Sequence, residues 1–171
     1  MIRKIALASA LAWSCSAAAA DGVALEYGRG DQHSDLWRLG VQWDWMTKRP
    51  LGPHLHWGAY WEASGGQWAN GERVTDLGIA PVFRLERAEG GLVPYLEGAI
   101  GLHLLSQVHL SEHRTSGTHF QFGDHVGIGV RFGENLQHDI GVRAQHLSNA
   151  GLNEPNPGMD FVILRYQYRF Q

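Results

Sequence analysis

Residues 37–45 read WRLGVQWDW, a stretch in which large apolar side chains alternate strictly with glycine or polar ones. A period of two is typical of a β-strand, because successive side chains point to opposite faces. One face carries the three tryptophans, Leu39 and Val41, and the other carries Arg38, Gly40, Gln42 and Asp44. The stretch therefore predicts a strand whose two faces meet different surroundings, one apolar and one polar.

The same alternation recurs along the chain and predicts eight strands. They are expected at residues 23–29, 37–45, 54–62, 76–86, 95–102, 120–132, 137–146 and 160–170. Short turns are expected at 46–52, 88–91 and 133–136, and longer connections at 30–34, 63–72, 104–117 and 147–158. Short and long connections that alternate between strands are typical of outer-membrane barrels. The sequence thus predicts an all-β fold, an eight-stranded antiparallel up-and-down transmembrane β-barrel.

A soluble β-sandwich is the alternative, and the second face of the strands argues against it. A sandwich buries its apolar faces and exposes mixed polar ones. Here the second face is rich in glycine and in Arg, Asp, Glu and Gln, which suits an eight-stranded barrel because its interior has room only for side chains. The apolar face would meet lipid, with an aromatic girdle near the strand ends. The girdle residues are Trp43, Trp45, Trp57, Trp61, Tyr166 and Tyr168.

Composition limits the other possibilities. The chain has 171 residues, which suffice for one domain with its own core. Aromatic residues make up 11% of it, a share that disfavours intrinsic disorder. The formal net charge of −3 gives no reason to expect a nucleic-acid partner. Beyond the first residues, no stretch approaches the roughly 20 consecutive apolar residues that a membrane helix needs.

Residues 1–20 have the pattern of a secretory signal peptide, with cleavage before Asp21. Arg3 and Lys4 precede an apolar segment, and Ala18 to Ala20 supply small residues at the cleavage site. A short membrane anchor and a lipoprotein modified at Cys15 are the alternatives, which the segment length and Trp13 disfavour. The expected mature domain, 21–171, contains no cysteine, so its fold does not depend on disulfides.

The connection 147–158 and its flanks bring together side chains suited to ester hydrolysis. With both ends of the domain in the periplasm, this connection lies at the extracellular end of the barrel. His146 shares the strand parity of Val142, and Asp160 shares that of Val162, so both are expected to point outward toward lipid. Ser148 keeps the same face if its strand continues. Ionisable side chains on a lipid face are costly, which favours a functional role for them.

These residue types match a serine hydrolase. An imidazole can take the proton of a serine hydroxyl, and a carboxylate can orient the ring and stabilise its cation. Asn149, Gly151 and Asn156 are candidates for stabilising the oxyanion or positioning the substrate. From spacing alone, a polar hairpin tip at the headgroup level remains the alternative. The pairs at His54 and His56 and at His109 and His113 have spacings that metals can use, but we expect no metal site.

Residues 146–158, HLSNAGLNEPNPG, resemble the signature of the PagL-type lipid A 3-O-deacylases. The stretches LGVQWDW at 39–45, APVF at 80–83 and PYLEGAIG at 94–101 fit the same family. The resemblance implies an eight-stranded barrel of the bacterial outer membrane. It also implies hydrolysis of the ester-linked 3-hydroxyacyl chain at position 3 of lipid A, without a cofactor. The substrate would be lipopolysaccharide of the outer leaflet, and a homodimer is considered as a further assembly.

The resemblance assigns the nucleophile to Ser148, the base to His146 and the acid to Asp160. Asp160 departs from the family pattern, because the acid there is usually glutamate.

Two other functions stay open at this point. One is a non-enzymatic barrel for adhesion or envelope stability, and the other is an acyltransferase that passes the chain to a second lipid. Asp124, which interrupts the apolar alternation of residues 120–132, has no explanation in the sequence.

Overall fold

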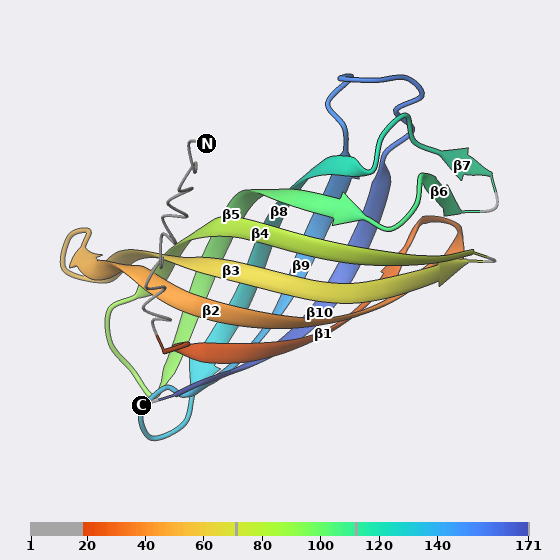
Figure 1. Cartoon of the computed structure of the whole chain (residues 1–171). Coiled ribbons are helices and arrows are strands. Elements are labelled where there is room, and N and C mark those ends of the chain that lie inside the picture. Colours follow the sequence, from red (N-terminus) through yellow and green to blue (C-terminus); the bar gives the residue numbers. More distant parts are fainter. Residues whose placement is uncertain (1–18, 71, 112, 171) are drawn as a thin grey trace, which may run out of the picture.

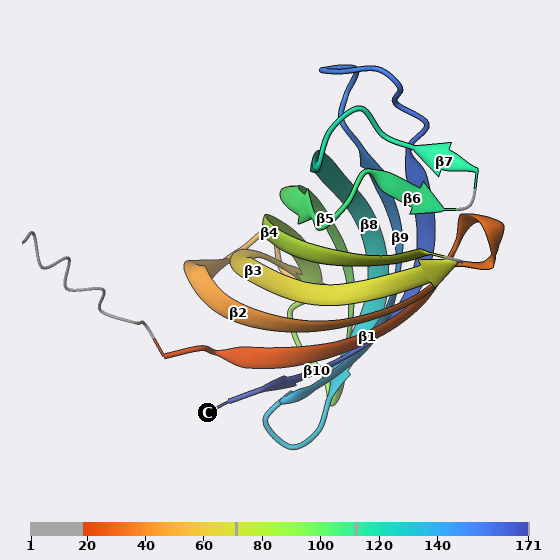
Figure 2. The same ribbon diagram turned by 45° about the vertical axis from the view of Figure 1, so that its right-hand side comes forward.

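The computed structural model describes residues 19–70, 72–111 and 113–170, and within them eight long strands close into an antiparallel barrel (Figures 1 and 2). The order around the barrel is β1, β10, β9, β8, β5, β4, β3, β2. The strands are β1 (Gly22–Gly30), β2 (Asp35–Pro50), β3 (Leu55–Asn70), β4 (Glu72–Arg87), β5 (Leu92–Leu105), β8 (Phe120–Phe132), β9 (His138–Ser148) and β10 (Met159–Arg169). The predicted fold is confirmed. The expected signal peptide falls almost wholly outside the described residues.

The two faces of the strands have the predicted surroundings. On the outer surface, Trp37 is 57% exposed and Leu39 is 65% exposed. On the inner surface, Arg38 and Gln42 are buried. An apolar outer surface is what a barrel in lipid requires, whereas a sandwich would have buried these side chains. No helix in the described part of the chain is both long and apolar enough to cross a membrane.

Paired charges fill the barrel interior. Arg143 donates to Glu97 and Glu62 at 2.7 Å and to Glu26 at 2.9 Å, and Arg84 donates to Asp139 at 2.7 Å. Buried charges are tolerated when they are paired and hydrogen-bonded in this way. Hydrogen-bonded charged side chains therefore fill the narrow interior of the eight-stranded barrel.

Two predicted connections differ from the structure. Residues 63–72 were expected to form a long loop, but β3 continues to Asn70 and β4 begins at Glu72. Ser64, Gly65 and Gly66 lie within the strand, where β3 pairs with β2. A Cβ on Gly66 would overlap the carbonyl oxygen of Trp37, so glycine is needed there for the close approach of the two backbones. The turn expected at 46–52 also lies later, because β2 extends to Pro50.

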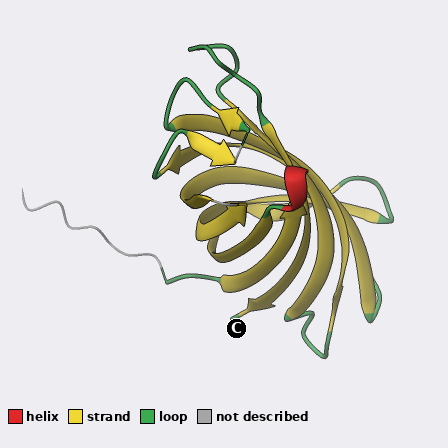
Figure 3. Cartoon of the chain, turned by 90° about the vertical axis from the view of Figure 1, so that its right-hand side faces the viewer, coloured by secondary structure: helices red, strands yellow, loops and turns green. Residues whose placement is uncertain are grey.

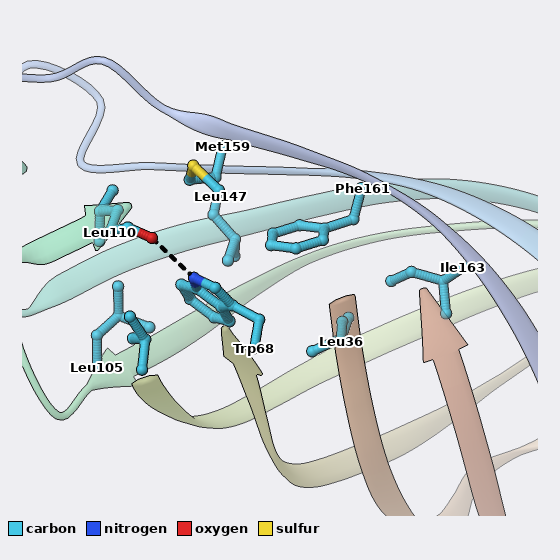
Figure 4. Packing of buried hydrophobic residues seen from close by; sticks show 9 residues of the cluster. Leu36, Trp68, Leu105, Leu110, Leu147, Met159, Phe161 and Ile163 are labelled. Carbon is cyan, nitrogen blue, oxygen red and sulfur yellow. Dashed lines mark hydrogen bonds between the residues drawn. The ribbon is translucent and has the colours of Figure 1, made fainter. Parts of the chain in front are cut away.

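The end of the barrel at which β9 stops and β10 starts is called here the loop end. The short 3-10 helix η1 (Asp31–His33) lies at this rim (Figure 3). A small hairpin formed by β6 (His109–Ser111) and β7 (Arg114–Thr115) extends over the same end. Beneath it, apolar side chains close the barrel (Figure 4), namely Leu36, Trp68, Val74, Leu105, Leu110, Leu147, Met159, Phe161 and Ile163. The loop end thus has a rigid base on which the β9–β10 connection can be held.

Candidate active site

His146 and Asp160 form a hydrogen-bonded pair on the outer surface of the loop end. They are direct cross-strand neighbours on β9 and β10, and 2.6 Å separates His146 Nδ1 from Asp160 Oδ1. Their side chains are 43% and 67% exposed, so both point outward, as predicted. An ionised carboxylate can only accept a hydrogen bond, so this contact favours the imidazole tautomer that carries its proton on Nδ1. Nε2 of the neutral ring is then left free to take a proton from another group.

Asp160 reaches the imidazole although its side chain is one methylene shorter than the glutamate usual in the family that the sequence resembles. The antiparallel register, which places Asp160 directly opposite His146, makes the short reach sufficient. Glu154, the other acid of the connection, accepts a hydrogen bond from the backbone N–H of Asn156 at 3.1 Å instead. The geometry therefore makes Asp160 the carboxylate that orients His146.

Ser148 is the last residue of β9 and shares the outward parity of His146. Its side chain is half-buried, and it lies opposite Phe122 of β8. Within the described residues, no hydrogen bond joins Ser148 to His146. Such bonds between nucleophile and base are often long in enzymes without substrate and tighten when substrate binds. The structure therefore joins the predicted base and acid and places the predicted nucleophile on the same face of the same strand.

The three predicted oxyanion or positioning residues organise the connection after Ser148. The backbone N–H of Asn149 donates to Oδ1 of Asn156 at 2.9 Å. The backbone N–H of Gly151 donates to Oδ1 of Asn149, also at 2.9 Å. The Asn149 side chain, fully buried, in turn donates to the carbonyl oxygen of Asn153 at 2.6 Å. These side chains thus preorganise the loop, and the two backbone donors already have acceptors within it.

Gly158 packs against the imidazole of His146. The sequence gives no signal of this contact, apart from the position of Gly158 in the 146–158 motif. Its backbone is left-handed, with φ of 64°. A Cβ at this position would lie 2.7 Å from Cε1 of His146 and 3.3 Å from its Nε2. Only glycine combines this conformation with this closeness to the ring. Gly158 therefore fixes one side of His146 while Asp160 fixes its Nδ1.

Replacing Gly158 with alanine should displace His146 and reduce its ability to accept a proton. We expect turnover to fall by about 100-fold, since a displacement of roughly 1 Å at a reacting group has effects of that size. The left-handed backbone should add a stability cost of about 1–2 kcal/mol. The measurement is the rate of the ester hydrolysis that the sequence predicts, beside the unfolding midpoint. Unchanged turnover in a folded Gly158→Ala protein would show that the ring does not depend on this contact.

A groove of about 920 Å³ runs across the outer surface beside the pair. His146 and Asp160 lie in its lining together with apolar side chains of neighbouring strands, among them Phe83, Ile100, Val126 and Val162. Asp124 also lines it, and the register places this residue beside His146, on the side away from Asp160. The interruption at Asp124 therefore belongs to the site, which sequence alone did not indicate. An apolar groove next to a base suits a substrate with a long hydrocarbon chain.

The histidine pairs singled out in the sequence do not gather with other ligands. In the described ranges, no group of three or more His, Cys, Asp or Glu side chains is placed to hold a metal ion. His109 instead contacts the hydroxyl of Thr115 within the β6–β7 hairpin, at 3.0 Å. These histidines thus have no part in the site around His146.

Comparison with known proteins agrees with this geometry. The family described as "Lipid A 3-O-deacylase (PagL)" matches residues 35–169. The chain belongs to the PagL family. The resemblance expected from residues 146–158 is therefore confirmed.

Two PagL relatives and one solved PagL structure are similar over most of their length. Lipid A deacylase PagL of Bordetella bronchiseptica is 36% identical, and the match covers 94% of this chain and 92% of that protein. Lipid A deacylase PagL of Pseudomonas aeruginosa is 34% identical, with 89% and 87% covered. The crystal structure of the outer membrane enzyme PagL superposes with a TM-score of 0.80 at 31% identity. That superposition covers 87% of this chain and 99% of the other.

Proposed function

We propose that this protein is an outer-membrane esterase that hydrolyses the 3-O-linked 3-hydroxyacyl chain of lipid A. The observation that carries the proposal is the His146–Asp160 pair, which faces outward beside an apolar groove in a chain of the PagL family. The name of the two relatives, lipid A deacylase, supports the substrate and the deacylation. Membership of the family described as 3-O-deacylases supports the position of the bond.

The proposed reaction uses Ser148 as nucleophile, His146 as base and Asp160 as the orienting acid. His146 Nε2 takes the hydroxyl proton of Ser148 while Oγ attacks the ester carbonyl carbon. The bond between the acyl carbon and the 3-oxygen of the sugar then breaks, which leaves the acyl group on Ser148. His146 returns the proton to the departing 3-oxygen. Water attacks the acyl-serine with His146 again as base, releasing a 3-hydroxy fatty acid and free Ser148. This sequence consumes one water and needs no cofactor.

Asn149, Gly151 and Asn156 are proposed to stabilise or surround the oxyanion through the loop that they organise. Two of the backbone donors already bind side-chain oxygens, at Asn156 Oδ1 and Asn149 Oδ1. An oxyanion near Ser148 would compete with these acceptors for the same N–H groups. Oxyanion stabilisation by these donors would therefore require the N–H groups of Asn149 and Gly151 to leave their present acceptors when the oxyanion forms.

The position of the pair suits a substrate that stays in its membrane. Lipid A occupies the outer leaflet, so its acyl esters lie at the level of the extracellular strand ends. We place the loop end on that side of the outer membrane, with the turns at 88–91 and 133–137 in the periplasm. The apolar groove would then accept the acyl chain from the side, without its extraction from lipid. His146, Ser148 and Asp160 all come from one chain, so the proposed reaction requires no homodimer.

Mass spectrometry of lipid A tests this function. Lipid A from cells that produce the protein, and from their detergent-solubilised membranes, should lack the 3-linked 3-hydroxyacyl chain. Cells without the protein serve as the control. Unchanged lipid A in both preparations would contradict the proposal and favour a non-enzymatic barrel. Transfer of the chain to another lipid, with no free 3-hydroxy fatty acid, would favour an acyltransferase.

Asp160 variants test the acid. Asp160→Asn should cut turnover by about 10⁴-fold, because an amide favours the wrong imidazole tautomer and cannot stabilise the cation. Asp160→Ala should behave similarly, whereas Asp160→Glu should retain substantial activity because it restores a carboxylate. Glu154→Gln is the matched control, since Glu154 binds its own loop rather than His146. Release of 3-hydroxy fatty acid is measured for each variant. If Glu154→Gln were the damaging change and Asp160→Asn stayed active, Asp160 would have only a structural role at the start of the last strand.

A further inference from the structure

The β6–β7 hairpin reaches the β9–β10 connection, although it lies far from it in sequence. Leu110 of the hairpin is buried in the apolar cluster, and its carbonyl oxygen accepts the indole N–H of Trp68 at 3.0 Å (Figure 4). The following segment then runs beside the connection. The N–H of Gly117 donates to the carbonyl of Pro155 at 2.7 Å, and Asn153 donates to the carbonyl of Gly117 at 2.8 Å. The hairpin is thus held independently of any single polar side chain.

Arg114 of this hairpin joins three separate parts of the loop end. Its Nη1 donates to Oδ2 of Asp31, in η1, at 2.7 Å. The same nitrogen donates to the carbonyl oxygen of Gly158 at 2.9 Å and lies 3.9 Å from the sulfur of Met159. The Arg114 side chain is 28% exposed and that of Asp31 is 32% exposed, so water only partly screens the ion pair. Charge-assisted hydrogen bonds of this kind hold geometry more firmly than neutral ones.

The carbonyl that Arg114 holds belongs to the residue that supports the imidazole. Gly158 packs against His146, where an added Cβ would lie 2.7 Å from Cε1. Two residues further along, Asp160 accepts the hydrogen bond from Nδ1 of the same ring. A shift of the chain at Gly158 would therefore move both the surface behind the ring and the carboxylate that orients it.

We propose that Arg114 is a positioning residue for the His146–Asp160 pair, acting through the carbonyl of Gly158 while Asp31 holds its guanidinium. The kinetic part of this inference rests on the proposed function, whereas the geometric part concerns the pair itself. Arg114 contacts neither the ring nor the carboxylate. Its removal should therefore loosen the pair without breaking the barrel, since Leu110, Trp68 and Gly117 still hold the hairpin.

Kinetics with lipid A in mixed detergent micelles give the first readout. Arg114→Ala should lower kcat by roughly tenfold to 100-fold with KM nearly unchanged, because the reacting groups lose alignment. Arg114→Lys, which keeps the charge but reaches fewer acceptors, should recover part of the loss. Arg73→Ala is the control, because Arg73 is exposed at the same end and forms no ion pair within the described residues. A rise in KM with unchanged kcat would mean that Arg114 serves to attract the anionic lipid, and this result would overturn the proposal.

A double-mutant comparison asks whether Arg114 acts through the pair. In an Asp160→Ala background, Arg114→Ala should add less than about a twofold further loss, because the geometry that it protects is already gone. Fully multiplicative losses would show that Arg114 acts by another route. Heat-modifiable gel mobility checks that each variant is folded, and Arg114→Lys replaces Arg114→Ala if the latter is not.

Long-range ¹H–¹⁵N spectra of the histidine rings in micelles test the geometry without any substrate. The Nδ1 resonance of His146, assigned by its absence in His146→Ala, should show the hydrogen-bonded Nδ1–H form and lose it in Arg114→Ala. His103 is an internal reference, because its Nδ1 lies 2.7 Å from Asp76 inside the barrel and should not change. If His146 keeps its bonded signature in Arg114→Ala, the positioning role is refuted, whatever the activity of the protein toward lipid A. If that signature is lost while wild-type protein leaves lipid A intact, the positioning role stands and the proposed function fails.

Discussion

Replacing Ser148 with alanine should abolish the release of 3-hydroxy fatty acid from lipid A while leaving the barrel folded. Removal of a serine nucleophile typically costs on the order of 10⁴–10⁶-fold in rate, because no other group can form the acyl-enzyme. The stability change should stay within about 0.5 kcal/mol, since the half-buried Ser148 side chain makes no hydrogen bond within the described residues. The measurement is fatty-acid release, with heat-modifiable gel mobility as the check on folding.

Ser106→Ala is the matched control for that experiment. Ser106 lies at the same end of the barrel, where its hydroxyl accepts the backbone N–H of Thr75 at 2.9 Å, outside the groove. This variant should keep wild-type turnover. A folded Ser148→Ala protein with near-normal activity would eliminate Ser148 as the nucleophile and would leave His146 and Asp160 to activate water directly.

Replacing His146 with alanine should cause a loss of similar size. The variant removes the group that accepts the serine proton, and with it the hydrogen bond to Asp160 and the ring that packs against Gly158. Because nucleophile and base act as a unit, the double variant Ser148→Ala with His146→Ala should be little worse than either single one. The same fatty-acid assay measures all three.

His138→Ala provides the control on the same strand. His138 lies at the opposite end of β9, and 2.8 Å separates its Nδ1 from the hydroxyl of Tyr166. Loss of this ring should leave turnover unchanged. If His146→Ala and His138→Ala were equally active, the imidazole beside Asp160 would have no part in the reaction.

Strand parity made the fold and the outward placement of His146 and Asp160 predictable. Side chains alternate between the two faces of a strand with a fixed period of two, so the alternation at 37–45 separates an apolar face from a polar one. The only choice left is which of the two faces points into the barrel. The same rule places His146 and Asp160 on the outer surface at one level, since a single hairpin connects their strands. Their hydrogen bond then follows from the antiparallel register.

Features that depend on contacts between distant segments were not predictable in this way. A long connection was expected at 63–72, yet Gly66 lies there where β3 approaches the backbone of β2. Asp124 interrupts the apolar alternation of its strand, but only the pairing of β8 with β9 shows that it lies beside His146. Arg114 lies in the short strand β7, and its contact with Gly158 crosses 44 positions of the sequence. Sequence periodicity contains no information on such approaches.

The most direct test of the central claim is hydrolysis of defined lipid A by the purified protein in water labelled with oxygen-18. An acyl-serine resolved by water predicts that the heavy oxygen enters the carboxyl group of the released 3-hydroxy fatty acid. The freed 3-hydroxyl of lipid A should keep its original oxygen, and Ser148→Ala should release neither product. Release of the acid without label, or loss of an acyl chain from another position of lipid A, would contradict the account.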